Sequence, residues 1–246
     1  MTTLHAAAVP SLPEIGAGDD LASLIAQRVP TLTGEDVVVV AHKVVSKAEG
    51  RVVRLRDVTA SPRAVELAAV LGKDDPRPVQ VVLDESAEVV RAARGVVITR
   101  THHGFVCANA GVDASNAAAG GELILLPRDP DASARALRAA LPGRPAVVIT
   151  DSFGRAWRHG QADIAIGVAG LVPLDDWRGR TDGVGRDLRA TWIAVADQAA
   201  AAADLVRLKN SREPVVILRG LARHITQDDG PGAAAIVRPL DEDLFA

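Results

Sequence analysis

Runs of hydrophobic residues, separated by polar and glycine-rich stretches, predict the strands of this chain. Continuous apolar runs over residues 36–40, 146–150 and 215–218 are typical of buried strands. The run at 146–150 is expected to end at Asp151, where the sequence becomes polar. The same pattern predicts further strands at residues 79–83, 95–99, 122–126 and 162–168.

Apolar residues that recur at intervals of three and four predict the helices. Over residues 61–72, Ser61 suits the N-cap, Pro62 the first turn and Gly72 the left-handed position after the helix. Other helical segments are expected at residues 131–141, at the alanine-rich stretch 191–209, and as a turn around residues 88–94.

Strands and helices alternate along the chain, but without the regular spacing of repeated βαβ units. Long loops are expected at residues 101–121 and 152–161, and the polar stretch 178–186 is also expected to be a loop. This organisation favours an α+β fold with a mixed sheet over a doubly wound one. The 246 residues suffice for one large domain over 1–246, or for two small interlocked ones.

Composition excludes several classes of protein. Hydrophobic residues make up 48% and charged residues 24%, which is ordinary for a globular domain. The formal net charge of −3, without a basic stripe, argues against nucleic-acid binding. The longest weakly polar run, residues 164–174, is too short to span a membrane, and no signal peptide is recognised. Cys107 is the single cysteine, which excludes an internal disulfide, and we expect a cytoplasmic protein.

Several common catalytic motifs are absent from the sequence. The chain has no Walker A loop, no complete dinucleotide-binding glycine fingerprint, no His-Glu-x-x-His and no Gly-x-Ser-x-Gly. Three polar loops that follow apolar strands carry the candidate chemistry instead.

The first loop, residues 101–116, concentrates histidine, asparagine, aspartate and serine, which are common in binding sites. His102 and His103 are adjacent, so they point apart and cannot easily share one metal ion. Cys107 is expected to be a core residue rather than a nucleophile. A surface loop stabilised by Asx turns is the alternative interpretation of this segment.

The second loop follows the strand at 146–150. Asp151 at a strand exit, with the hydroxyl of Ser152 beside it, suits a hard divalent cation. A turn or N-cap role, which is common for aspartate, is the alternative. Arg155 and Arg158 offer forked donors for phosphate or carboxylate, or form solvated ion pairs. In the third loop, Lys47 follows a strand and could meet a phosphate; a surface position is the alternative.

Taken in order, these strings resemble one family. The chain is similar to coenzyme F420-0:gamma-L-glutamate ligases in four segments: LPEI (12–15), VVVVAHKVVSKAEGR (37–51), THHGFVCANAGVDASN (101–116) and ITDSFGRAWRHGQADIAIG (149–167). The resemblance runs from about residue 10 to 220. It implies an unusual α+β fold in an intertwined homodimer, without the C-terminal flavin-reductase-like domain found fused in some relatives.

The resemblance also implies an activity. The family members are GTP-dependent amide ligases that add L-glutamate to coenzyme F420-0, a deazaflavin cofactor precursor. They use two divalent ions, Mg²⁺ or Mn²⁺, and often K⁺. GTP would convert a carboxylate of the precursor into an acyl phosphate, and the amine of glutamate would then attack it. This route needs no protein nucleophile.

Site residues follow from the matching positions. The expected metal ligands are Asp113, Asp151 and Ser152, and the expected groups holding phosphates or substrate carboxylates are Lys47, Arg155 and Arg158. The expected nucleotide contacts are Leu12, Pro13, Glu14, Ile15, His42, Lys47, Asn116 and Lys209. His42 stands where the family often has serine, and Arg207-Leu208-Lys209 replaces a stretch often written Met-Gly-Gln or Met-Gly-Lys.

Other functions use the same residues. A metal-dependent phosphohydrolase would release phosphate from GTP without an amine acceptor. A related ligase would act on another acyl substrate, and a cofactor-binding scaffold would bind its ligand without turning over GTP.

Overall fold

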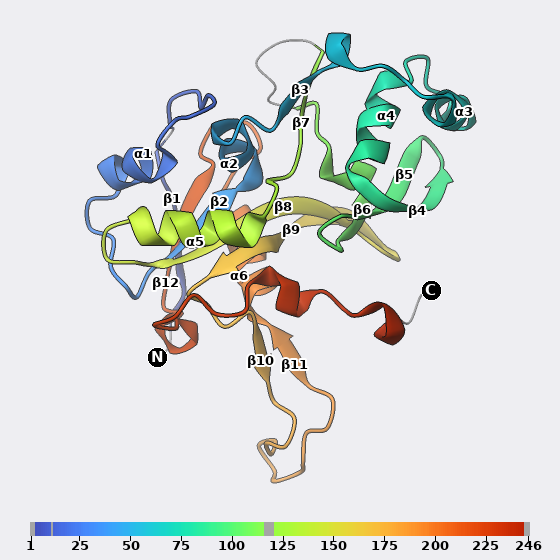
Figure 1. Ribbon diagram of the computed structural model, residues 1–246. Helices are drawn as coiled ribbons and strands as arrows, with labels where there is room; N and C mark the ends of the chain where they lie inside the picture. The colour runs from blue at the N-terminus through green and yellow to red at the C-terminus, as the bar shows by residue number, and fades with distance from the viewer. Residues whose placement is uncertain (1–2, 11, 116–120, 244–246) are drawn as a thin grey trace.

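A five-stranded mixed sheet forms the centre of the protein (Figure 1). The computed structural model describes residues 3–10, 12–115 and 121–243. The strand order is β1-β12-β2-β8-β9, in which β2 and β8 are parallel and the other neighbours antiparallel. The strands are β1 (His5–Ala8), β2 (Val37–Ala41), β8 (Ala146–Arg155), β9 (Arg158–Ala169) and β12 (Val215–Arg219).

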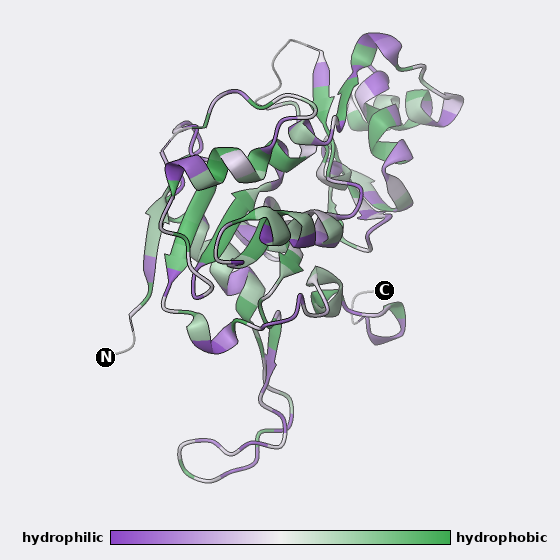
Figure 2. Ribbon diagram, turned by 60° about the vertical axis from the view of Figure 1, so that its left-hand side comes forward, coloured by the Kyte–Doolittle hydropathy of each residue, from purple (hydrophilic) through white to green (hydrophobic). Residues whose placement is uncertain are grey.

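Helices cover both faces of this sheet (Figure 1). Val38 and Val40 pack on one face in a cluster with helices α1 (Leu21–Arg28) and α5 (Pro130–Ala140). Val37 and Val39 belong to the cluster on the other face, which contains α6 (Val195–Asp204). Alternate side chains of a strand point to opposite faces, so a continuous valine run fills both cores. The hydrophobic colouring of the sheet follows this burial (Figure 2).

A second, smaller unit packs beside the central sheet (Figure 1). It contains helices α3 and α4 and a three-stranded antiparallel sheet in the order β4-β5-β6. Its core includes Ala64, Ala68, Val79, Val82 and Val97. The elements are α3 (Pro62–Leu71), α4 (Arg77–Asp84), β4 (Ser86–Ala93), β5 (Val96–Thr101) and β6 (Val106–Ala108); the strand pair β3 (Val52–Arg54) and β7 (Glu122–Ile124) leads to it.

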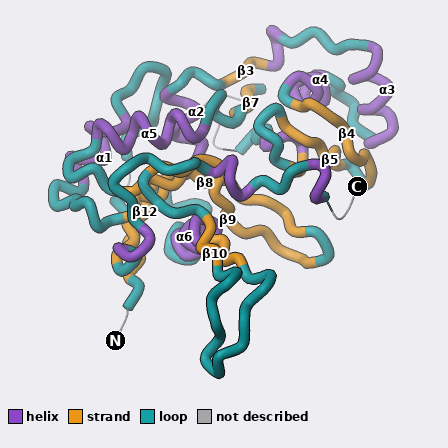
Figure 3. Tube along the Cα trace, turned by 60° about the horizontal axis from the view of Figure 1, so that its bottom comes forward, coloured by secondary structure: helices purple, strands orange, loops and turns teal. Residues whose placement is uncertain are grey.

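A narrow arm projects from the body of the protein (Figure 3). Strands β10 (Leu174–Asp176) and β11 (Trp192–Ala194) pair at its base, and the predicted loop at 178–186 forms its far end. Arg178 stacks over the ring of Trp192, with the guanidinium carbon 4.2 Å from the ring centroid. Within the described residues, none of the helices has the length and apolar character needed to cross a bilayer.

Most of the predicted elements are confirmed. The apolar runs at 36–40, 95–99, 122–126, 162–168 and 215–218 all overlap strands, and 131–141 overlaps α5. The cap residues of α3 also behave as predicted. Ser61 accepts a hydrogen bond from the backbone of Ala64 at 3.2 Å, and Gly72 adopts the left-handed conformation with φ of 68°.

Two neighbouring predictions are wrong. Residues 79–83 form part of helix α4, because Val79 and Val82, three residues apart, pack into the same core while Gln80 bonds Asp84 on the outside. Residues 88–94 belong to strand β4 rather than to a helical turn. A tight turn at Arg94-Gly95, both with positive φ, brings β5 back antiparallel to β4.

Three boundaries also differ. Strand β8 does not end at Asp151 but continues to Arg155, and its hairpin with β9 replaces the loop expected at 152–161. The loop expected at 101–121 contains β6. The alanine-rich helix is shorter than 191–209, because residues 192–194 pair with β10 before α6 begins.

Candidate active site

The parallel pairing of β2 with β8 brings two distant parts of the chain together. Ala41 pairs with Thr150, and both strands run toward the same edge of the sheet. Helix α2 (His42–Ala48) begins directly after β2, while Asp151 follows Thr150 in β8. At this edge lies a cleft of about 770 Å³.

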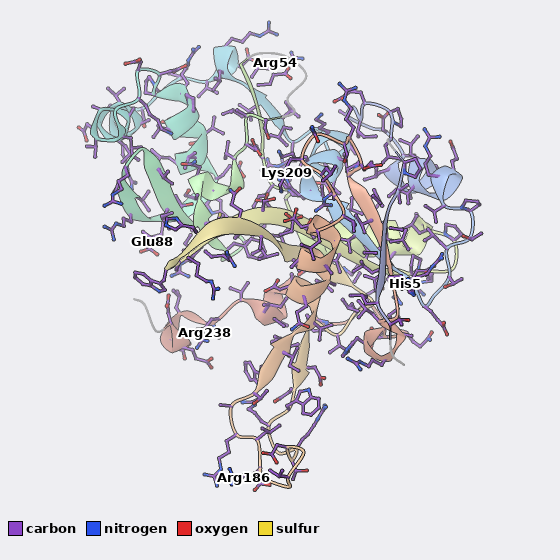
Figure 4. All side chains as sticks on the ribbon, turned by 180° about the vertical axis from the view of Figure 1, so that it is seen from behind. His5, Arg54, Glu88, Arg186, Lys209 and Arg238 are labelled. Atoms are coloured by element: carbon purple, nitrogen blue, oxygen red, sulfur yellow. The ribbon has the colours of Figure 1, made fainter. Side chains whose placement is uncertain are left out.

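Most of the predicted site residues line this cleft. They come from segments far apart in the sequence: Leu12, Pro13, Glu14, Ile15, His42, Lys47, Asp151, Ser152 and Lys209. Lys209 lies on the loop between α6 and β12 (Figure 4). One concave surface is thus formed by four segments: the loop after β1, the start of α2, strand β8 and the loop before β12.

The first two residues of α2 contact the two predicted metal-binding aspartates. His42 Nε2 lies 3.3 Å from Asp151 Oδ1, and Lys43 Nζ lies 2.6 Å from Asp113 Oδ2. Asp113 does not itself line the cleft, but Lys43 does. Mutual backbone hydrogen bonds with Ile124, of 2.8 and 3.0 Å, fix the position of Asp113. Both carboxylates therefore lie at the same end of one helix.

Asp113 is an ionised carboxylate at neutral pH. Burial favours its neutral form, but hydrogen bonds from Lys43 and from the backbone of Ser115 outweigh burial, so the pKa of Asp113 lies below its ordinary value. The bond from the Ser115 backbone is 2.6 Å long. The carboxylate keeps its charge but already shares it with an ammonium group.

Sequence reasoning missed the most buried charge at the cleft. Asp163, in β9, is 2% exposed and accepts hydrogen bonds from Thr150 at 2.8 Å and from Ser152 at 2.6 Å. The guanidinium of Arg207 donates a further hydrogen bond to the same carboxylate. The signal was a lone aspartate within the apolar run 162–168, where a charge requires partners.

Two lysines of the cleft are held by neighbouring oxygens. Lys47 Nζ lies 2.5 Å from Glu14 Oε1, which joins α2 to the loop after β1. Lys209 Nζ lies 2.6 Å from the hydroxyl of Ser152. Because that hydroxyl also donates to Asp163, Ser152 is engaged both as donor and as acceptor.

Some predicted residues lie elsewhere. Arg155 and Arg158 pair with each other at the far end of the β8–β9 hairpin and do not line the cleft. His103 contacts the carbonyl of Pro127 at 2.9 Å. Cys107 is buried in the core as expected, and burial, followed by the charge of Asp151, raises its pKa to about 12. Asn116 lies outside the described residues.

The sequence pattern of the family described as F420-0:Gamma-glutamyl ligase matches residues 10–220. The chain belongs to this family. It is 46% identical to a coenzyme F420:L-glutamate ligase of Halobacterium salinarum, covering 98% of this chain and 95% of that protein. It is 44% identical to one from Methanopyrus kandleri, over 100% and 98%. The identity to the ligase of Methanothermobacter thermautotrophicus is 42%, over 96% of each chain.

The family match includes every segment of the cleft. The matched residues 10–220 contain four segments that line the cleft. These are residues 12–15, the start of α2, strand β8 and the loop that carries Lys209. The arm at β10 and β11 lies within it as well. The similarity thus concerns the whole fold that builds the site.

The residues that the family resemblance assigns to metal can be tested against this geometry. Among the described residues, no three His, Cys, Asp or Glu side chains form a cluster able to hold a metal ion. The carboxylate oxygens of Asp151 and Asp113 are nonetheless hard ligands of the kind that Mg²⁺ and Mn²⁺ prefer. Mg²⁺ is commonly held by one or two carboxylates, with phosphate and water completing its shell. These carboxylates would suit a hard divalent ion whose remaining ligands come from outside the chain.

Proposed function

We propose that this protein is a ligase that uses GTP to add L-glutamate to coenzyme F420-0, giving gamma-glutamyl F420. The observation that carries the proposal is the convergence, on a single cleft, of the family's expected nucleotide-binding residues that the structure describes, which are all of them except Asn116. Similarity over nearly the whole chain to several coenzyme F420:L-glutamate ligases supports the substrate assignment.

The proposed reaction activates a carboxylate before the amide forms. The γ-phosphoryl group of GTP passes to a carboxylate oxygen of F420-0, and GDP leaves. The amine of L-glutamate then attacks the carbonyl carbon of the acyl phosphate. The new C–N bond replaces the C–O bond to phosphate, inorganic phosphate departs, and the amine loses a proton.

The cleft supplies cations for this chemistry. Lys47, Arg207 and Lys209 line it, and their positive charges suit the phosphates of a nucleotide. Glu14, which bonds Lys47, fixes the direction of that ammonium group. Arg207 is held by Asp163, so its guanidinium is oriented before any ligand binds. Such preorganised charges stabilise phosphoryl transfer without rearrangement.

Asp113 and Asp151 are proposed to hold Mg²⁺ or Mn²⁺, two ions per site, with Ser152 as a further ligand. Bound ions would neutralise the charge that develops on the phosphate oxygens. For Ser152 to contribute, Lys209 must release its hydroxyl, because the ammonium group of Lys209 donates a hydrogen bond to it. K⁺ is proposed as an additional cation, and its role is tested by replacing K⁺ with Na⁺ in the assay.

The protein is also proposed to act as a homodimer. The arm at β10 and β11 extends from the body (Figure 3). It exposes Trp192 by 48% and Val184 by 79%, which suits a contact with a second copy. In such a dimer, Arg155 and Arg158, which lie far from the cleft of their own chain, would hold a substrate carboxylate in the cleft of the second copy. Light scattering coupled to size-exclusion chromatography should give twice the mass of the chain.

The function is tested with F420-0, L-glutamate, GTP or ATP, and Mg²⁺ or Mn²⁺, followed by mass spectrometry. We expect GTP-dependent addition of glutamate. Asp113→Asn and Asp151→Asn should each abolish it while circular dichroism stays unchanged. Phosphate release without an amine acceptor would indicate a phosphohydrolase, and GTP turnover only with a different acid would indicate another acyl substrate. An active double variant would contradict the assigned roles.

A further inference from the structure

His42 has a ring nitrogen without a hydrogen-bond partner. The side chain is buried, with 1% of its surface exposed, and lies at the junction between β2 and α2. Its Nδ1 atom is 3.3 Å from the hydroxyl of Ser46, one helical turn later. Its Nε2 atom bonds no other group within the described residues. Buried polar atoms of this kind are rare unless a ligand completes them.

The unpartnered Nε2 atom of His42 lies next to the carboxylate of Asp151 at the cleft. Nε2 is 3.3 Å from Asp151 Oδ1, but the pair lacks hydrogen-bond geometry. If Nδ1 carries the proton and donates it to Ser46, Nε2 presents a lone pair beside an oxygen of the Asp151 carboxyl group. Two electron-pair donors held this close attract a cation.

Among the described residues, no cationic side chain of the cleft, Arg212 included, contacts this pair. Lys209 is bonded to Ser152 and Arg207 to Asp163, while Lys43 and Lys47 are paired with Asp113 and Glu14. The backbone of Ser152 donates to Asp151 Oδ1 at 2.8 Å, which fixes that oxygen without neutralising it. The position between His42 and Asp151 is therefore built for a cation from outside the chain.

We propose that His42 Nε2 is a direct ligand of the divalent ion held by Asp151. This inference rests on the proposed function, because that function brings a metal ion to Asp151. Two ligands 3.3 Å apart, each about 2.1 Å from a shared ion, subtend an angle of about 100° at that ion. This angle lies between the ligand–metal–ligand angles of octahedral and tetrahedral coordination. The two atoms are therefore spaced as two neighbouring ligands of one metal ion would be.

A nitrogen ligand changes which metal the site prefers. Imidazole binds Mn²⁺, Co²⁺ and Zn²⁺ more readily than Mg²⁺, which favours oxygen ligands and keeps its water. The site of this chain should therefore select Mn²⁺ over Mg²⁺ more strongly than a site with oxygen ligands alone.

Electron spin-echo spectroscopy of bound Mn²⁺ tests the proposal directly. The full chain is loaded with Mn²⁺ and GDP, with natural-abundance or ¹⁵N-labelled histidine. We expect a nitrogen coupling from a directly bonded imidazole that changes with the label. His42→Gln should remove the coupling and weaken Mn²⁺ binding about tenfold or more. The control His5→Gln, at an exposed position in β1, should retain both.

The outcomes separate this inference from the proposed function. Bound Mn²⁺ without histidine coupling in the unsubstituted protein would overturn the role of His42, even if glutamate addition is observed. Coupling that persists in His42→Gln would also overturn it. Coupling without glutamate addition would leave His42 as a ligand and refute the ligase. Failure of Mn²⁺ and GDP to bind would overturn both. The labelled, unsubstituted protein keeps the test valid even if His42→Gln fails to fold.

Discussion

Arg207 donates a hydrogen bond to Asp163, and this ion pair joins the loop after α6 to strand β9. Both side chains are largely buried, at 9% and 3% exposure. Because removing one partner of a buried pair leaves an uncompensated charge, Arg207→Met should lower the free energy of unfolding by about 3 kcal/mol. Urea denaturation measures the loss.

An exposed arginine provides the control for that experiment. Arg56 is 73% exposed in its pair with Asp57, so Arg56→Met should change stability by less than about 0.5 kcal/mol. Equal effects of the two substitutions would show that the pair at Asp163 contributes no special stability.

The contact between Lys43 and Asp113 predicts a pH dependence. In the folded protein the pKa of Asp113 is lowered, since hydrogen bonds from Lys43 and Ser115 outweigh the opposing effect of burial. The unfolded chain therefore binds a proton first as the pH falls. Stability from this group is complete above about pH 4 and is lost as the pH falls through the folded-state pKa.

Lys43→Met should raise the pKa of Asp113, because burial is then opposed by fewer hydrogen bonds. Carboxyl ¹³C chemical shifts in metal-free protein report this pKa directly. Between neutral and acidic pH, the free energy of unfolding should decrease less in the variant than in the unsubstituted protein. An unchanged titration of Asp113 would mean that Lys43 does not control its charge.

Cys107 should be chemically inert in the folded protein. Burial, together with the nearby charge of Asp151, raises the pKa of its thiol to about 12, so little reactive thiolate exists near neutral pH. A disulfide reagent such as dithiobis(nitrobenzoate) should label none of the native protein at pH 8 and one thiol per chain in guanidinium. Rapid labelling of the native protein would contradict this burial.

Gly167 allows α5 to pack closely against β9. A side-chain carbon at this position would overlap the carbonyl oxygen of Pro130, at the start of α5. Gly167→Ala should therefore cost about 1–3 kcal/mol through overpacking, and lower the melting temperature by several degrees. Gly183→Ala is the matched control, since nothing lies within 4 Å of that position.

Sequence patterns predicted the central layer of the fold better than the smaller unit. The valine run at β2 is apolar throughout because both faces of its strand are covered, and that pattern has one simple interpretation. Residues 79–83 are also rich in valine, but they form a helix, in which Val79 and Val82 pack into one hydrophobic cluster and Val81 into another. The preference of valine for strands is the same in both segments, so it does not predict which one is a helix. The packing of each segment against the rest of the fold determines its structure.

The candidate site was predictable where motifs marked it. The resemblance pointed to Asp151 and Lys47, and the structure brings both to one cleft. Neither motif nor spacing revealed that Arg207 neutralises Asp163, since the two residues meet only when the loop after α6 folds over β9. Arg155 and Arg158 follow Asp151 closely in sequence, yet the extension of β8 carries them away from the cleft.

The strand order has a consequence for synthesis of the protein on the ribosome. Strand β12, close to the C-terminal end of the chain, lies between β1 and β2, which are made first. Until β12 emerges, the nascent chain exposes the unpaired edges of two valine- and alanine-rich strands, a state prone to aggregation. Protein yield in the cell should therefore depend on chaperones that shield those edges during translation.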